Sequence, residues 1–176
     1  DAWFTLHERF GSLKMKEILD PAISYAEKGF PLTELIAHYL QHSAYVFKDY
    51  PNFSATYMPE GKLPEKGKIF KDPALANTYR QLAKGGREAF YSGPIAENIA
   101  NFIQGQGGFL TVEDLAQHQS EWVQPMSINY RGYDVWELPP NGQGIAALQI
   151  LKILEAYDLR GMGFGTTNYI HHFVEA

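Results

Sequence analysis

A glycine-rich run is the first feature of this chain that could take part in chemistry. Residues 142–147 read Gly-Gln-Gly-Ile-Ala-Ala, which fits the G-x-G-x-x-A spacing of a dinucleotide-binding turn. In such a turn, backbone N–H groups at a helix N-terminus approach a pyrophosphate. Here Pro139-Pro140 precedes the glycines, and no second parallel strand with an acidic ribose-binding end follows. We therefore interpret the glycines as a turn that lets a helix pack closely against a strand.

Two pairs of histidines could be considered as metal ligands. His38 and His42 are spaced i, i+4, which places both imidazoles on one face of a helix. Tyr39 stands where a zinc-protease motif would have glutamate, and no third ligand is evident, so we interpret both histidines as surface residues. His171 and His172 are adjacent and would point to different sides of a helix, so they cannot share one metal.

Hydroxyl and carboxylate side chains form no complete catalytic set. Thr166-Thr167 lies inside the chain, where it lacks the free α-amine that serves a catalytic threonine as base, and we expect it to cap a helix. No G-x-S-x-G sequence is present. Glu113-Asp114 suits a helix N-terminus, and Glu121 and Asp134 have no evident partner carboxylate. Asn52-Phe53-Ser54 matches a glycosylation sequon, which matters only in a eukaryotic secretory protein.

Composition excludes several classes of protein. With 176 residues, 45% hydrophobic and 20% charged, the chain fits one globular domain or two small ones. A net charge of −5 without a dense Lys/Arg run argues against nucleic-acid binding. The absence of cysteine excludes disulfides and cysteine-ligated zinc. No run approaches the roughly 20 apolar residues of a membrane span. The chain opens on Asp1 without a signal peptide, from which we expect a mature product or a fragment.

Most of the chain is predicted to be helical. Residues 49–71 are expected to be irregular, because prolines and glycines interrupt them. Ser, Thr or Asp before a helix, Pro at its first position and Gly after its end mark most of the boundaries. The expected helices cover residues 3–10, residues 21–28 with Asp20 as N-cap, a segment after Thr33, residues 73–84 ending at Gly85-Gly86, a segment from Pro94, a short capping-box helix after Thr111, residues 145–154, and a last helix capped by Thr166 or Thr167.

Two short strands are expected near residue 130. Alternating apolar residues predict strands at 126–130 and 133–137, joined by a turn at Arg131-Gly132. The helix over 145–154 is apolar on almost every side, which predicts deep burial. Two strands alone do not form a stable sheet, so helices or further strands must cover them. The predicted fold class is α+β, mostly helical with a β-hairpin.

Several runs of residues resemble one enzyme family, and they keep its order and spacing across nearly the whole chain. The chain resembles the central part of a γ-glutamyltranspeptidase large subunit. The matching runs are Leu6-His7-Glu8-Arg9-Phe10-Gly11, Pro21-Ala22-Ile23 with Ala26 and Gly29-Phe30-Pro31, Gly85-Gly86-Arg87-Glu88-Ala89-Phe90-Tyr91, Gly107-Gly108 with Leu110-Thr111 and Glu113-Asp114-Leu115, Tyr130-Arg131-Gly132-Tyr133, and Pro139-Pro140-Asn141-Gly142-Gln143-Gly144.

The resemblance implies part of an N-terminal-nucleophile hydrolase with an αββα sandwich. In that family a precursor cleaves itself and exposes a threonine at the start of a small subunit. The threonine attacks the γ-glutamyl amide of glutathione or a similar donor, with its own α-amine as base and backbone donors around the oxyanion. The acyl group then passes to water, an amino acid or a peptide.

The chain departs from the family pattern by omission. The Thr-Thr-His run that begins the small subunit is absent, since Asn168 follows Thr167. The family arginine that binds the glutamate carboxylate lies upstream of the matching region. We therefore assign no catalytic, cofactor-binding or metal-binding residue and expect no cofactor. The arginines to which we do not transfer that role are Arg9, Arg80, Arg87, Arg131 and Arg160.

The function predicted from the sequence is a non-catalytic segment of a γ-glutamyltransferase or γ-glutamyl hydrolase, inactive alone. Residues 1–176 are expected to form one segment of the large subunit, with a helical part over 1–120 and a strand pair, buried helix and terminal helix over 121–176. Expected partners are the rest of the large subunit, the small catalytic subunit and, in the parent, a γ-glutamyl substrate. Periplasmic or secreted localisation follows from the resemblance, and a cytoplasmic parent stays open.

Two alternatives stay open. One is an acylase of the same fold, similar to cephalosporin acylases. The other is a self-standing helical binding module, which predicts a soluble, cooperative monomer with no exposed sheet edge. The large-subunit segment instead predicts exposed apolar strand faces and a tendency to associate.

Overall fold

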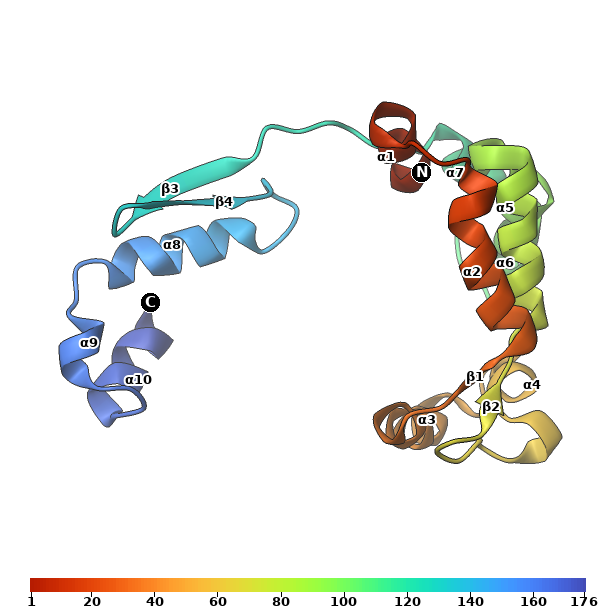
Figure 1. The fold of residues 1–176 in the computed structure, drawn as a ribbon, viewed down its shortest axis with the longest axis horizontal. Coiled ribbons are helices and arrows are strands. Elements are labelled where there is room, and N and C mark those ends of the chain that lie inside the picture. Colours follow the sequence, from red (N-terminus) through yellow and green to blue (C-terminus); the bar gives the residue numbers. More distant parts are fainter. The chain divides into compact units, whose positions relative to one another are not determined.

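The structure is a computed structural model that describes the backbone of residues 1–176 and all side chains except that of Glu60. The chain divides into two compact units, Asp1–Ser120 and Glu121–Ala176, which are described separately (Figure 1). No described helix is both long enough and apolar enough to cross a membrane.

The first unit is built of helices and one minimal strand pair. Its elements are α1 (Ala2–Phe10), α2 (Met15–Lys28), β1 (Phe30–Pro31), α3 (Glu34–Phe47), α4 (Phe53–Tyr57), the 3-10 turn η1 (Pro59–Gly61), β2 (Ile69–Phe70), α5 (Pro73–Tyr91), α6 (Pro94–Gly105) and α7 (Val112–Gln117). α2 and α5 lie side by side (Figure 1). Leu19 and Ile23 from α2 meet Leu82 from α5 in the hydrophobic core of this unit.

The predicted start of α2 at Pro21 is wrong. The helix begins at Met15, and the Glu17 carboxylate accepts a hydrogen bond from the Lys14 amide at 3.2 Å. Pro21 therefore sits inside the helix, where it removes one backbone hydrogen bond. The extra turn brings Leu19 into the core, where only 6% of it is exposed. Burial of this side chain offsets the cost of an internal proline.

The predicted irregular stretch over 49–71 is wrong in part. It contains α4, η1 and β2, and β2 pairs antiparallel with β1 through Phe30–Phe70 and Pro31–Ile69. Edge-to-face contact between the Phe30 and Phe70 rings at 6.0 Å accompanies the pairing. Strands of two residues are too short to show an alternating pattern, so no periodic signal predicts them.

Most helix caps are confirmed. Thr33, Asp72, Thr111 and Thr166 each accept a hydrogen bond from the amide three residues on. The predicted stop at Gly85-Gly86 is also confirmed as a break, because Gly86 has φ 64° and ψ −155°. The chain returns to helix immediately afterwards, so α5 reaches Tyr91.

The second unit contains the predicted hairpin. β3 (Met126–Tyr130) and β4 (Tyr133–Glu137) pair antiparallel, with Ile128 opposite Val135. Arg131 and Gly132 both have positive φ, 51° and 90°, which suits the right-handed twist of a two-residue hairpin. The remaining elements are α8 (Gly144–Leu154), α9 (Leu159–Met162) and α10 (Thr167–Glu175).

The predicted deep burial of the 145–154 helix is wrong for this chain. α8 packs against one face of the hairpin and against α10 (Figure 1), and it buries Leu148 and Leu154. Ile153 on the same helix is 48% exposed. The reason is that these neighbours cover only part of an all-round apolar helix. The predicted fold class, α+β and mostly helical with a β-hairpin, is confirmed.

Candidate functional site

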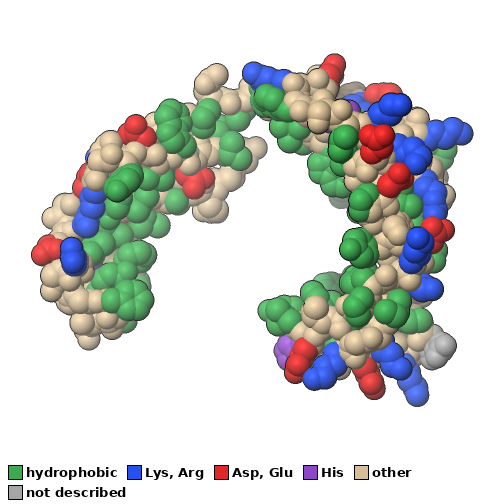
Figure 2. Space-filling view, viewed as in Figure 1, with side chains coloured by type: hydrophobic (Ala, Val, Ile, Leu, Met, Phe, Trp, Pro, Cys, Tyr) green, Lys and Arg blue, Asp and Glu red, His purple; other side chains and the backbone are tan. Residues whose placement is uncertain are grey.

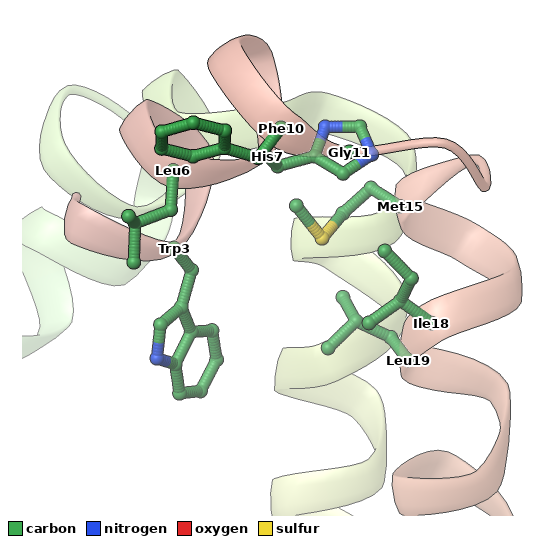
Figure 3. Close-up of a pocket in the computed structure, with 8 residues that line it drawn as sticks. All are labelled: Trp3, Leu6, His7, Phe10, Gly11, Met15, Ile18 and Leu19. Atoms are coloured by element: carbon green, nitrogen blue, oxygen red, sulfur yellow. The ribbon is translucent and has the colours of Figure 1, made fainter.

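An apolar groove lies between α1 and α2 in the first unit (Figure 3). Its volume is about 470 Å³. Trp3 and Leu6 reach it from α1, and Met15 and Ile18 reach it from α2. Trp3 is 57% exposed, so the groove is an open hydrophobic surface. The full lining is Trp3, Leu6, His7, Phe10, Gly11, Met15, Ile18 and Leu19.

His7 is the one ionisable side chain of the groove, and its ring is fixed by structure. Its Nε2 lies 2.6 Å from the Leu13 carbonyl oxygen. Because a carbonyl only accepts, Nε2 carries the proton and donates. A Cβ at Gly11 would lie 2.3 Å from His7 Cδ2, so glycine is required for this close approach. His7 therefore fastens the turn after α1, and the groove can hold apolar groups but offers no catalytic pair.

An ion pair joins three separate segments of the first unit. Arg87 Nε donates to Asp1 Oδ1, and Arg87 Nη2 donates to the His118 carbonyl. The Ser120 amide donates to Asp1 Oδ2 at 2.5 Å. The Arg87 guanidinium also lies 4.6 Å from the centre of the Tyr91 ring. The Asp1 side chain is only 5% exposed, so its charge depends on these donors.

The sequence did not predict the contacts among Asp1, Arg87 and Ser120. Arg87 and Ser120 lie 86 and 119 residues from Asp1 in the chain, and no local pattern links them. The Arg87 guanidinium pairs with Asp1 in this structure. Of the other arginines considered, Arg80 pairs with Glu27 at 2.6 Å and Arg9 lies over the Phe10 ring.

A polar contact fastens the hairpin turn of the second unit to the end of α8. Glu155 Oε1 accepts from the Arg131 amide at 2.9 Å, and Arg131 Nη2 donates to the Tyr157 carbonyl at 2.8 Å. Lys152 Nζ donates to the Asn129 carbonyl at 3.1 Å and to Glu155 Oε2. Hydrogen bonds from the Arg131 amide and from Lys152 lower the pKa of the Glu155 carboxyl. Arg131 therefore holds the hairpin turn against the end of α8.

Of the two glycines in the pattern, Gly142 and Gly144, only Gly144 is needed for close packing. A Cβ at Gly144 would lie 2.8 Å from both Glu137 Cβ and the Leu138 carbonyl oxygen. Glycine at 144 therefore allows α8 to begin against the end of β4. Because β4 belongs to an antiparallel hairpin, the turn also lacks the parallel βαβ setting of a dinucleotide site.

The histidine pairs do not form a metal centre within the described residues. The rings of His38 and His42 are close, with centroids 5.2 Å apart on α3. No group of three or more His, Cys, Asp or Glu side chains in the described part of the chain could hold a metal ion. His172 Nδ1 lies 2.8 Å from the Asn168 carbonyl oxygen, to which it donates, and this bond commits it to its own helix.

Thr166 and the remaining carboxylates have structural contacts. Thr166 Oγ1 accepts from the Tyr169 amide at 3.2 Å, so it caps α10. Asp134 accepts from the Asn129 side chain across the hairpin at 2.9 Å. Glu113 lies in the first turn of α7, and Glu121 begins the second unit. Asn52 is exposed, with φ 68°, immediately before α4.

Three carboxyl groups of the described residues have lowered pKa values, those of Glu88, Asp114 and Glu155. A hydrogen bond from Arg87 lowers the pKa of Glu88, and hydrogen bonds from Thr111 lower the pKa of Asp114. In each of these groups, and in Glu155, hydrogen bonds donated to the carboxylate favour its ionised form. Such carboxylates suit hydrogen-bond acceptors in structural contacts and not the proton donors of general acid catalysis.

Comparison with known proteins accounts for the whole chain. The family model described as gamma-glutamyltranspeptidase matches residues 1–176. The chain is 35% identical to the glutathione hydrolase-like YwrD proenzyme of Bacillus subtilis, over all of this chain and 34% of that protein. It therefore spans about a third of the length of this curated relative.

Solved structures agree. A gamma-glutamyltranspeptidase of Helicobacter pylori superposes with a TM-score of 0.91 at 30% identity, covering 98% of this chain and 50% of that one. A cephalosporin acylase of Bacillus halodurans superposes with a TM-score of 0.89 at 39% identity, covering 97% of this chain and 33% of that one. The chain belongs to the γ-glutamyltranspeptidase family.

Proposed function

We propose that this chain is a non-catalytic segment of the large subunit of a γ-glutamyltranspeptidase-family enzyme. The observation that carries the proposal is the family match over residues 1–176, combined with coverage of about a third of the B. subtilis relative. In the parent, the nucleophile is an N-terminal threonine of a small subunit that this chain does not contain. That threonine transfers the γ-glutamyl group of glutathione or a similar amide to water or to an amine.

The arrangement of the second unit supports a role inside a larger αββα sandwich. The hairpin has two strands, and neither outer edge pairs with another described strand. Trp136 on β4 is 60% exposed, and Ile153 on α8 is 48% exposed. Hydrophobic side chains also lie on the surface of each unit (Figure 2). An unpaired edge and exposed apolar groups are costly in a free domain and suit burial against further layers.

The proposed partners are the rest of the large subunit and the small catalytic subunit. The B. subtilis relative is named as a proenzyme, which fits a parent that matures by cleavage. We further propose that the parent acts in the periplasm or outside the cell, as expected from the family.

An acylase is the second candidate for the parent. The observation in its favour is the 39% identity with the cephalosporin acylase of B. halodurans. The two activities differ in substrate, so parallel assays of the parent with a γ-glutamyl anilide and with a cephalosporin amide distinguish them. Preferred turnover of the cephalosporin would replace the γ-glutamyl assignment but keep the large-subunit role.

The experiment that tests the non-catalytic role uses the precursor that contains this chain. Thr166→Ala in the precursor is expected to leave self-cleavage and chromophore release from a γ-glutamyl anilide intact, because the hydrogen bonds of the Thr166 hydroxyl are local ones at the start of a helix. Alanine at the first residue of the small subunit should abolish both. Loss of turnover in correctly cleaved, folded Thr166→Ala enzyme would contradict the proposal.

The binding-module alternative makes a different prediction for the isolated chain. It expects a cooperative monomer in solution, whereas the large-subunit segment expects association through its exposed apolar surface. Sedimentation velocity over a range of chain concentrations separates the two. A single monomeric species at every concentration would favour the binding module.

A further inference from the structure

One asparagine of the chain stands in a chemically distinctive setting. Asn141 is followed by Gly142, and every other asparagine is followed by a larger residue. In deamidation, the backbone nitrogen of the residue after an asparagine attacks the asparagine side chain. A Cβ on that following residue hinders the attack, and glycine has none. The other asparagine pairs are Asn52-Phe53, Asn77-Thr78, Asn98-Ile99, Asn101-Phe102, Asn129-Tyr130 and Asn168-Tyr169.

The fold places the Asn141-Gly142 pair in an open turn. The pair lies between β4 and α8, outside both elements (Figure 1), and both residues are exposed. Apart from Gly142 and its two chain neighbours, no described atom lies within 4 Å of a Cβ built on Gly142. Among the described contacts, none engages the Gly142 amide or the Asn141 side chain in a hydrogen bond. No described hydrogen bond therefore prevents the Gly142 nitrogen from approaching the Asn141 side-chain amide.

Another asparagine of the same unit shows the contrast. The Asn129 side-chain oxygen accepts from the Gly132 amide at 3.1 Å, and its nitrogen donates to Asp134 at 2.9 Å. These bonds hold its carboxamide, and Asn129 lies within β3. A strand fixes the backbone away from the geometry that brings the next amide onto the side chain.

We propose that Asn141 is a site of spontaneous deamidation in the folded chain. The Gly142 nitrogen forms a bond to the Asn141 side-chain carbonyl carbon, the bond from that carbon to its NH2 breaks, and ammonia leaves with the proton of the Gly142 amide. Water then opens the resulting succinimide at either carbonyl. Opening at one carbonyl gives aspartate, and opening at the other gives isoaspartate, with no reagent other than water.

The modification would change the turn that leads into α8. Either product adds a negative charge close to the α8 N-terminus and to Glu137, whose side chain lies beside Gly144. Isoaspartate also inserts a methylene into the backbone path between β4 and α8. This inference concerns the turn as it lies in this chain, and its chemistry requires none of the catalytic steps of the proposed enzyme.

Mass spectrometry of trypsin-digested chain tests the proposal, after incubation of the folded protein at mildly alkaline pH. The peptide Gly132–Lys152 contains Asn141 as its single asparagine. It should gain the mass of an NH2-to-OH exchange and separate into aspartate and isoaspartate forms. The peptide Glu88–Arg131, with Asn98, Asn101 and Asn129, is the internal control and should stay unmodified.

Gly142→Ala is the matched variant, because its Cβ enters open space and Gly142 is not one of the glycines with positive φ. Deamidation should slow by about tenfold, the factor given by a barrier higher by about 1.4 kcal/mol. No mass gain in the folded wild-type chain, an equal rate in Gly142→Ala, or a gain that fragmentation assigns to Gln143 or Gln149 would each overturn the proposal. So would deamidation in the free Gly132–Lys152 peptide without deamidation in the folded chain.

Discussion

Removal of one core leucine should measure how far α2 and α5 stabilise the first unit. Leu82 is 6% exposed and packs against Leu19 and Ile23. Leu82→Ala deletes three carbon groups at about 0.8 kcal/mol each, or about 2.4 kcal/mol of lost transfer free energy. A residual cavity adds to this, but its walls include half-buried side chains that can relax, so we expect a total of about 3 kcal/mol.

Leu75→Ala is the matched control on the same helix. Leu75 is 40% exposed, so the same chemical change should cost only about 1 kcal/mol and leave no closed cavity. The assay is urea unfolding followed by the fluorescence of Trp3, with Trp122 and Trp136 replaced by phenylalanine so that the first unit alone is observed. Equal losses for the two variants, or a loss below about 1 kcal/mol for Leu82→Ala, would refute this account of the core.

Three further predictions concern the polar contacts. Arg87→Met should cost the first unit about 2 kcal/mol in urea unfolding, because it leaves the nearly buried Asp1 carboxylate without its cation; a neutral result would contradict this. Thr166→Ala should cost the second unit about 1 kcal/mol while Thr167→Ala costs little, because only Thr166 caps α10; equal thermal shifts would count against the cap. The pKa of the Glu155 carboxyl is lowered in the folded chain, so its ionised form stabilises the fold at pH values above the ordinary carboxyl pKa. This stabilisation is lost as the pH falls through the lower folded-state pKa. Glu155→Gln should therefore flatten the acid limb of a curve of unfolding free energy against pH.

Local chemistry made the caps and the hairpin predictable from sequence. Asp72 and Thr166 cap their helices through hydrogen bonds that span three residues, and such bonds need no tertiary partner. The hairpin turn at Arg131-Gly132 is equally local. A sequence pattern identifies features of this kind because all of their parts lie within one short window.

Tertiary contacts explain what the sequence did not predict. α2 begins before Pro21 because Leu19 is buried against α5, which a local proline rule does not include. The β1–β2 pair joins Phe30 to Phe70 across a long segment that contains α3, α4 and η1. Arg87 and Asp1 lie 86 residues apart in the chain, and the tertiary structure of the first unit brings them together. The exposure of Ile153 could not be predicted either, because it depends on what covers α8 and not on the composition of the helix.

Under the proposed function, catalysis by the parent enzyme resides outside residues 1–176. The most direct test is release of chromophore from a γ-glutamyl anilide by the purified chain, without any other subunit. We predict no release above the blank reaction, because the proposed function assigns the nucleophile to a small subunit outside this chain. Turnover that stays with the chain through purification would contradict the claim, since a catalytic group would then have to lie within these residues.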